Sequence, residues 1–189
     1  MNSMNDRLQI NWKLFYEKEA EFKKFNPEMC PGVPIRIELI FELLPHNNIC
    51  SVLDAGCGDG YLCHMLKSQK SIRKVVGIDL SVKRVKRAIK VYNDYNFLVG
   101  NVYNLPFADN SFDLVICSEV VEHLEDPLHA VKELMRVSKR YVLITVPNNE
   151  SLEKIVCPYC LKTFFRDGHI NRFNENRLRV LLQEMKIIV

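Results

Sequence analysis

The sequence predicts an α/β fold with one doubly wound, mostly parallel β-sheet and helices on both faces. Short apolar runs typical of buried strands alternate along the chain with segments of helical spacing. The first apolar run ends in three closely spaced glycines, Gly56, Gly58 and Gly60, as a strand does when it enters a ligand-binding turn. The 189 residues, 48% of them hydrophobic, suffice for one domain with a sizeable core, so we expect a single domain over 1–189.

Two helices are expected before the first strand. Aromatic residues at near-helical spacing predict an amphipathic helix over 11–25, and a second helical pattern covers 35–44 and stops before Pro45. Residues 1–45 therefore form the predicted N-terminal helices, which we expect to pack on the sheet.

Residues 46–147 form the predicted core. Because parallel strands need crossover connections, strands that alternate with helices predict βαβ units. Ser81 is suited to cap the helix that ends near Val91, and Pro127 is suited to begin the next one. The predicted strands cover 51–54, 73–80, 97–100, 112–117 and 141–146.

The last part of the chain changes character. Residues 148–176 are rich in asparagine, proline and charge, and we interpret them as a lid that faces the substrate. Residues 177–189 are expected to hold most of the last helix and, from Lys186, the start of a sixth strand. The sheet would then lack a final antiparallel strand, and its unfinished edge could pair in a homodimer.

Composition limits the classes of function. The net charge of +3 is small, and the cations of 83–90 alternate with apolar residues as on a solvated helix face, so a nucleic-acid partner is not expected. Seven cysteines are an odd number, which favours reduced thiols over a disulfide framework. The N-terminus is too polar for a signal peptide and no run is long enough to span a membrane, so we expect a cytoplasmic protein.

Candidate ligand-binding residues follow the predicted strands. In open α/β sheets, ligands bind outside the carboxyl ends of the strands, where Asp54, Asp79, Asn101 and Ser118 are placed. A dinucleotide fingerprint would need a third glycine at position 61, which is tyrosine. A glycine-rich turn without a ligand is the alternative.

Four motifs in order, LDAGCGDG, GIDLS, NLPFADNSFDLVICSEVVEHLEDP and RYVLITVPN, resemble the class I S-adenosylmethionine (SAM) dependent methyltransferases over roughly 34–148. The resemblance is to the methyltransferase type 11, or ubiquinone-biosynthesis-type, members. It implies a Rossmann-like methyltransferase fold, SAM as cofactor and S-adenosylhomocysteine as product.

The resemblance also implies roles for particular residues. Arg36 would pair with the SAM carboxylate, and Asp54 would support the amino group. Asp79 would bind the ribose hydroxyls. At the position of Asn101 the family often has an aspartate that accepts a hydrogen bond from the adenine amino group. The side-chain amide oxygen of Asn101 can take this role as a neutral acceptor. The remaining candidates are Gly56, Cys57 and Gly58 at the methionine moiety, Leu80 and Val102 at the adenine, and Ser118 at the end of the fourth strand.

His123 is the candidate general base, needed only if the acceptor must lose a proton. A structural role for this histidine is the alternative. The motif of Glu119, Glu122 and His123 also resembles small-RNA 2′-O-methyltransferases, which bind a divalent ion through two glutamates and two histidines, and His169 could be the second histidine. Such a set would suit Mg²⁺ or Mn²⁺.

A second metal hypothesis concerns Cys157 and Cys160, whose CxxC spacing lets two thiolates share one zinc ion. His169 is a conceivable third ligand, and Cys30 could be the fourth. Two unrelated thiols or a redox pair are the alternatives.

These observations favour a methyltransferase that moves a methyl group from SAM to an O, N or C atom of a small molecule. The alternatives are a SAM-binding module that is degenerate or depends on a partner, and a metal-assisted RNA 2′-O-methyltransferase.

Overall fold

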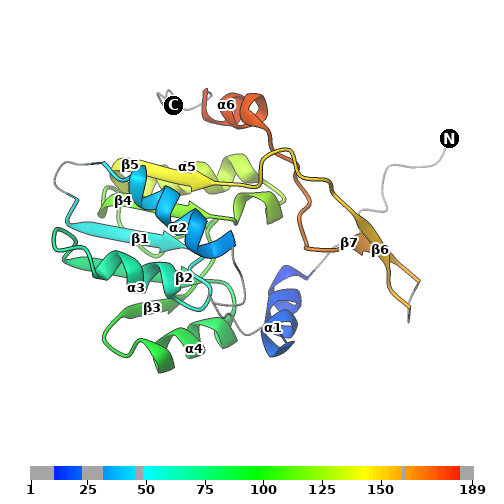
Figure 1. Ribbon diagram of the computed structural model, residues 1–189, viewed down its shortest axis with the longest axis horizontal. Helices are drawn as coiled ribbons and strands as arrows, with labels where there is room; N and C mark the ends of the chain where they lie inside the picture. Colours follow the sequence, from blue (N-terminus) through cyan, green and yellow to red (C-terminus); the bar gives the residue numbers. More distant parts are fainter. Residues whose placement is uncertain (1–10, 23–31, 46–48, 159–160, 184–189) are drawn as a thin grey trace.

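The fold is built on a five-stranded parallel sheet with the strand order β3-β2-β1-β4-β5. The computed structural model describes residues 11–22, 32–45, 49–158 and 161–183. The chain starts the sheet in its middle and moves outward in both directions, which confirms the doubly wound prediction (Figure 1). The strands are β1 (Ser51–Ala55), β2 (Lys74–Asp79), β3 (Asn96–Val99), β4 (Phe112–Ser118) and β5 (Ser138–Thr145).

Helices cover both faces of the sheet. Successive strand residues point to opposite faces, so Val52 belongs to one hydrophobic core and Leu53 to the other. Each fully buried side chain of this kind contributes roughly 1.5–3 kcal/mol. One face carries α2 (Gly32–Glu42), α3 (Tyr61–Lys67) and α4 (Val82–Val91), and the other carries α5 (Pro127–Val137) and α6 (Glu175–Gln183).

The helix starts predicted from Ser81 and Pro127 are confirmed. The Ser81 hydroxyl accepts a hydrogen bond from the amide of Arg84 and caps α4. Asp126 does the same for α5 by accepting from the amide of His129, with Pro127 in the first turn.

Helix α1 (Trp12–Phe22) does not pack on the sheet, so this part of the prediction is wrong. Its main contacts are with α4, and it lies beyond the carboxyl ends of the strands (Figure 1). The cations of α4 that face α1 are Lys83, Arg84 and Arg87. That side of α4 is therefore an interface within the chain and not a solvated face.

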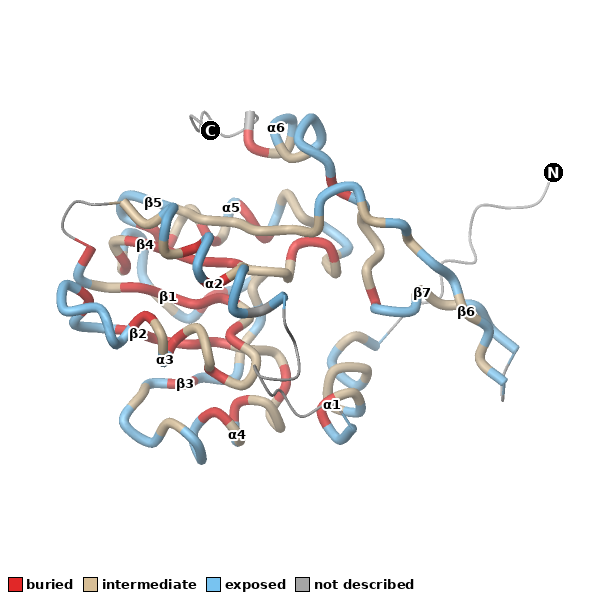
Figure 2. Tube along the Cα trace, in the orientation of Figure 1, coloured by how far each residue is buried: buried red, intermediate tan, exposed pale blue. Residues whose placement is uncertain are grey.

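Residues 148–176 contain a β-hairpin that the sequence did not predict, formed by β6 (Lys154–Val156) and β7 (Thr163–Phe165). The hairpin extends away from the domain and is mostly exposed (Figure 2). The segment that follows the hairpin is anchored by Phe173, which is only 2% exposed and packs in the same core as Leu53.

Three sequence-based predictions fall outside the described residues: the sixth strand from Lys186, and the positions of Cys30 and Cys160. Among the helices that the structure describes, none has the length and apolar character needed to cross a membrane.

Candidate functional site

A cavity of about 200 Å³ opens at the carboxyl ends of β1 and β4. It lies where the sheet changes winding direction, the usual ligand site of this architecture. Its lining includes six of the predicted cofactor residues: Arg36, Asp54, Gly56, Cys57, Gly58 and Ser118.

The glycine turn forms one wall of the cavity. Gly56, Gly58 and Gly60 all have positive φ, at 92°, 54° and 85°. A Cβ on Gly56 would lie 2.3 Å from a methyl carbon of Val120, whereas at Gly58 its nearest neighbour would be the Arg84 guanidinium at 3.5 Å. Gly56 is therefore required by packing, while Gly58 leaves its backbone open on the cavity side.

Asp79 joins the glycine turn to the start of α4. One carboxylate oxygen accepts from the amide of Gly58 at 2.9 Å, and the other accepts from the amide of Ser81 at 2.8 Å. Each oxygen keeps a lone pair for a further donor. Burial raises the pKa of this carboxyl above its ordinary value, against the effect of the two amides and Arg84.

Asp54 is almost fully buried beneath the turn, at 2% exposure. Its carboxylate accepts a hydrogen bond from the Cys63 thiol at 3.3 Å. Burial raises the pKa of Asp54 to about 7 because the interior disfavours the charged form.

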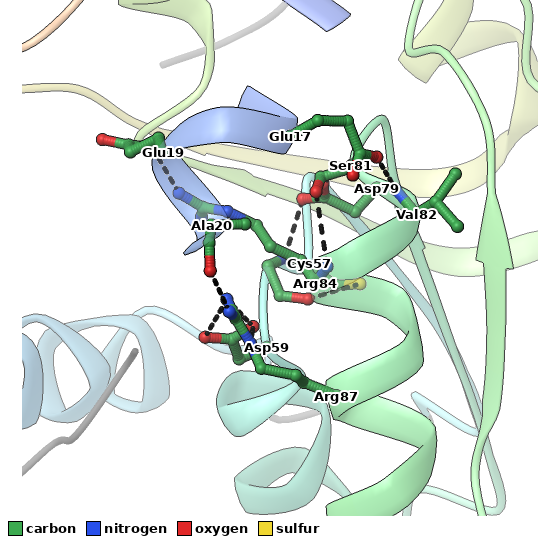
Figure 3. Close-up of polar contacts among 11 residues, drawn as sticks. Glu17, Glu19, Ala20, Cys57, Asp59, Asp79, Ser81, Val82, Arg84 and Arg87 are labelled. Atoms are coloured by element: carbon green, nitrogen blue, oxygen red, sulfur yellow. Dashed lines mark hydrogen bonds and ion pairs between the residues drawn. The ribbon is translucent and has the colours of Figure 1, made fainter. Parts of the chain in front are cut away.

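The predicted adenine-binding residues are not among the residues that line the cavity. Leu80 directly follows β2, and Asn101 and Val102 follow β3, at the expected end of the sheet. The side-chain oxygen of Asn101 accepts from the amide of Tyr103 at 3.0 Å, so one of its lone pairs is already used. Helix α1 reaches this side of the site, where Glu17 accepts from the amide of Val82 beside Asp79 (Figure 3).

Arg36 and Glu119 form an ion pair at 3.4 Å at the cavity wall. Glu119 has a left-handed backbone with φ of 56°, which is unusual for a residue with a side chain and often marks a functional site. Its other oxygen accepts from the Thr145 hydroxyl, which in turn bonds to Ser118. Glu119 is thus directed toward Arg36 and Thr145.

Glu122, His123 and His169 form a separate cluster, in which one potential ligand atom from each lies within 4.8 Å of the other two. Glu122 is fully buried, and burial raises its pKa to about 8. Burial also lowers the pKa of His123 to about 4, so this imidazole is neutral at pH 7 and a weak base. The general-base role of His123 stays a prediction.

The predicted zinc set of Cys157, Cys160 and His169 is not brought together in the part of the chain that the structure describes, which leaves out Cys160. The hairpin pairs run from Lys154 and Phe165 at the base to Val156 and Thr163 at the tip. Cys157 follows the tip end of β6, whereas His169 follows the base end of β7 and packs on His123 at 4.5 Å between ring centroids. The whole hairpin therefore separates the two residues.

The sequence did not single out Tyr16 and Arg84 as site residues. Among the residues that the structure describes, the buried side-chain polar atoms without a hydrogen-bond partner are the Tyr16 hydroxyl, Nε of Arg84 and both carboxylate oxygens of Glu122. The Tyr16 ring lies 6.0 Å from the Arg84 guanidinium carbon and 5.7 Å from the His123 ring. The aromatic spacing of α1 identified a buried face, but not what that face covers.

Residues 53–144 match a family model described as a methyltransferase domain. A demethylmenaquinone methyltransferase of Thermotoga maritima is 31% identical over 133 residues, which are 68% of this chain and 56% of that protein. The chain spans about half the length of the curated relatives that it matches.

Two solved structures share the architecture. A SAM-dependent methyltransferase from Aquifex aeolicus has a TM-score of 0.63 at 23% identity, over 88% of this chain and 90% of that chain. A methyltransferase solved in complex with the Trm112 methyltransferase activator of Haloferax volcanii has a TM-score of 0.62 at 25% identity, over 78% of this chain and 64% of that chain.

Proposed function

Because the chain belongs to the class I SAM-dependent methyltransferases, we propose that it transfers a methyl group from SAM to a nucleophilic atom of a small molecule. The observation that carries the proposal is Asp79, whose carboxylate links the glycine turn to α4 and keeps two lone pairs for a diol. The same geometry, an acid after the second strand, binds ribose hydroxyls in other nucleotide sites.

The residues around the cavity fit the methionine part of the cofactor. Arg36 supplies a cation for the carboxylate of SAM. This carboxylate would replace the Glu119 carboxylate as the partner of Arg36. Asp54 supplies an acceptor for the amino group. The open backbone of Gly58 allows close approach without a side chain in the way.

The adenine would lie along Leu80 with its edge toward Asn101 and the amide of Val102. Leu80 offers an apolar surface, and the remaining lone pair of the Asn101 oxygen can accept from the adenine amino group.

Bound SAM supplies an electrophilic methyl group on a sulfonium, so the protein needs chiefly to align the acceptor and exclude water. Alignment of this kind can contribute about 7–11 kcal/mol to lowering the barrier. Helix α1 and the segment around His169 lie on the open side of the strand ends and would form the walls of the acceptor site.

Titration calorimetry with SAM and with S-adenosylhomocysteine tests the proposal. We expect both to bind, and Asp79→Ala to weaken binding at least tenfold because two hydrogen bonds to the ribose are lost. Asp94→Ala, at an exposed residue outside the site, is the matched control and should bind as the wild type does. Tight NAD binding without SAM binding would overturn the proposal.

A second candidate keeps SAM binding but makes activity depend on a partner protein. It is favoured by the similar methyltransferase whose structure was solved in complex with the Haloferax volcanii Trm112 activator. In this chain the outer strand β3 exposes Leu98 and Val99, at 40% and 46%. Methyl transfer from labelled SAM to small molecules of a cell extract distinguishes the two, since SAM binding without any transfer would favour the second.

A further inference from the structure

We propose that Glu122, His123 and His169 bind a divalent transition-metal ion, such as Mn²⁺ or Zn²⁺, beside the cofactor cavity. One potential ligand atom of each residue lies within 4.8 Å of the other two. Glu119, which the sequence grouped with them, is not part of the cluster, because its carboxylate faces Arg36 and Thr145. The proposal rests on these three residues and is independent of the proposed methyl transfer.

The surroundings of Glu122 favour a bound cation. Its side chain is fully buried, yet neither carboxylate oxygen has a hydrogen-bond partner. A buried polar group without a partner costs about 1–3 kcal/mol, and more when it is charged. Arg36 does not satisfy it, because that guanidinium pairs with Glu119. A cation between Glu122 and the two imidazoles would supply the missing partner.

The two histidines are oriented as metal ligands are. Nδ1 of His123 lies 3.1 Å from the carbonyl oxygen of Gly168, and Nδ1 of His169 bonds to the carboxylate of Glu150. Metal-bound histidines almost always make such a bond with the ring nitrogen that does not bind the metal. Both rings thus have Nδ1 occupied, which leaves Nε2 as the ligand atom.

Backbone hydrogen bonds fix the segment of Glu122 against the segment of His169. The amides of Ile170 and Asn171 both donate to the carbonyl oxygen of Glu122 at 2.9 Å, and the Asn171 side chain donates to the carbonyl of Leu124 at 2.6 Å. His169 is therefore held opposite Glu122 by the residues on its carboxyl side, across almost fifty residues of sequence.

The donor set indicates the class of ion. Two imidazoles and one carboxylate suit zinc, manganese or iron, whereas magnesium and calcium prefer oxygen ligands only. Three protein ligands also leave coordination positions open, as in catalytic sites. Arg36 and Glu119, which line the cavity, are close enough to act on the charge of Glu122. If the proposed methyl transfer holds, the open positions would bind an oxygen or nitrogen of the acceptor.

Mn²⁺ is the appropriate probe, because it binds imidazole and carboxylate but has little preference for the thiolates of Cys157 and Cys160. The full chain, purified and treated with a chelator, is titrated with Mn²⁺ while the paramagnetic resonance signal of free Mn²⁺ is followed. We expect one ion per chain, and displacement by Zn²⁺ as the stronger-binding ion. The proposal would be overturned if the wild-type protein left the signal of free Mn²⁺ unchanged and calorimetry detected no Zn²⁺ binding.

Variants identify the ligands. Glu122→Gln keeps the shape of the side chain, and His169→Ala removes one ligand; each should weaken Mn²⁺ binding at least tenfold. Glu150→Gln should weaken it about tenfold, because this residue acts through His169. Circular dichroism checks that each variant is folded, and Glu150→Gln keeps the test informative if the other two unfold.

Two matched controls complete the design. Glu119→Gln lies three residues before Glu122 and Cys157→Ser lies at the hairpin tip, and both should bind Mn²⁺ within about threefold of wild type. Binding that falls with Glu119→Gln or Cys157→Ser but not with Glu122→Gln would contradict the proposed ligands. A negative Mn²⁺ result together with intact SAM binding would leave the proposed function standing.

Discussion

Gly56 and Gly58 are two residues apart in one turn, but a side chain would meet different surroundings at the two positions. At Gly56 a Cβ would overlap Val120, and at Gly58 it would reach only the end of the Arg84 side chain. Both positions have positive φ, which costs an L-residue roughly 1–2 kcal/mol.

This difference predicts unequal effects of the same substitution. Gly56→Ala should lower the free energy of unfolding by more than about 2 kcal/mol, because strain in the core adds to the backbone cost. Gly58→Ala, the matched comparison, should lower it by about 1 kcal/mol. Urea unfolding of the two variants measures this, and equal losses would show that Val120 moves aside freely.

At the residue scale, the sequence could predict the acids and glycines in and next to the cavity because their positions depend on the nearest strand. Asp54 and Asp79 close two parallel strands, and parallel strands end at the same edge of the sheet. Tyr16 and Glu150 could not be predicted in the same way, since no strand end fixes them. They reach the site through α1 and through the segment after β5.

At the element scale, helix α1 is held by contacts between charged and polar groups. Glu19 pairs with Arg84 at 2.6 Å, and Arg87 donates to the carbonyl oxygen of Ala20 (Figure 3). Lys83 pairs with Glu21. Partly buried pairs of this kind contribute about 1 kcal/mol or less. Helix α1 should therefore open more readily than the sheet.

Hydrogen exchange tests this attachment. Glu19→Ala should speed the exchange of the α1 amides about fivefold, the effect of losing about 1 kcal/mol, and leave β1 and β4 unchanged. Lys13→Ala, at an exposed position of the same helix, should have no effect. If Glu19→Ala left α1 protected, the contact of the Tyr16 ring with His123 would be the one that holds it.

The hairpin of β6 and β7 shows why the sequence could not predict every element. Each strand has three residues, too few to show a two-residue alternation against the surrounding polar segment. Four strands of the sheet, β1, β2, β4 and β5, were predictable because each has apolar residues in both cores, which makes the run continuous.

At the scale of the whole molecule, the buried Asp54 links stability to pH. The folded protein holds its proton more tightly than the unfolded chain does, since the pKa rises from 3.8 to about 7. The contribution of this group to the free energy of unfolding is therefore largest near pH 4 and falls as pH rises toward 7. For a shift of about three units the fall is of the order of 4 kcal/mol.

Asp54→Asn should remove this dependence, so that the variant gains stability relative to wild type between pH 5 and pH 8. Urea unfolding at the two pH values measures the change. Asp113 should respond to pH in the opposite direction, because hydrogen bonds from Cys50 and Ser51 lower the pKa of its carboxyl. Asp113→Asn should therefore be less stable than wild type above pH 4. A constant difference between wild type and Asp54→Asn across this range would mean that Asp54 stays ionised.

The sequence by itself determined the doubly wound sheet, the glycine turn and the acids at the strand ends, because each depends on local pattern and on the geometry of parallel strands. Only the tertiary structure decided that α1 lies on α4, that Glu119 pairs with Arg36, and that His169 lies beside Glu122 and His123 and not beside Cys157. These contacts join segments far apart in the chain. No local pattern specifies them, because they depend on how separate elements pack together.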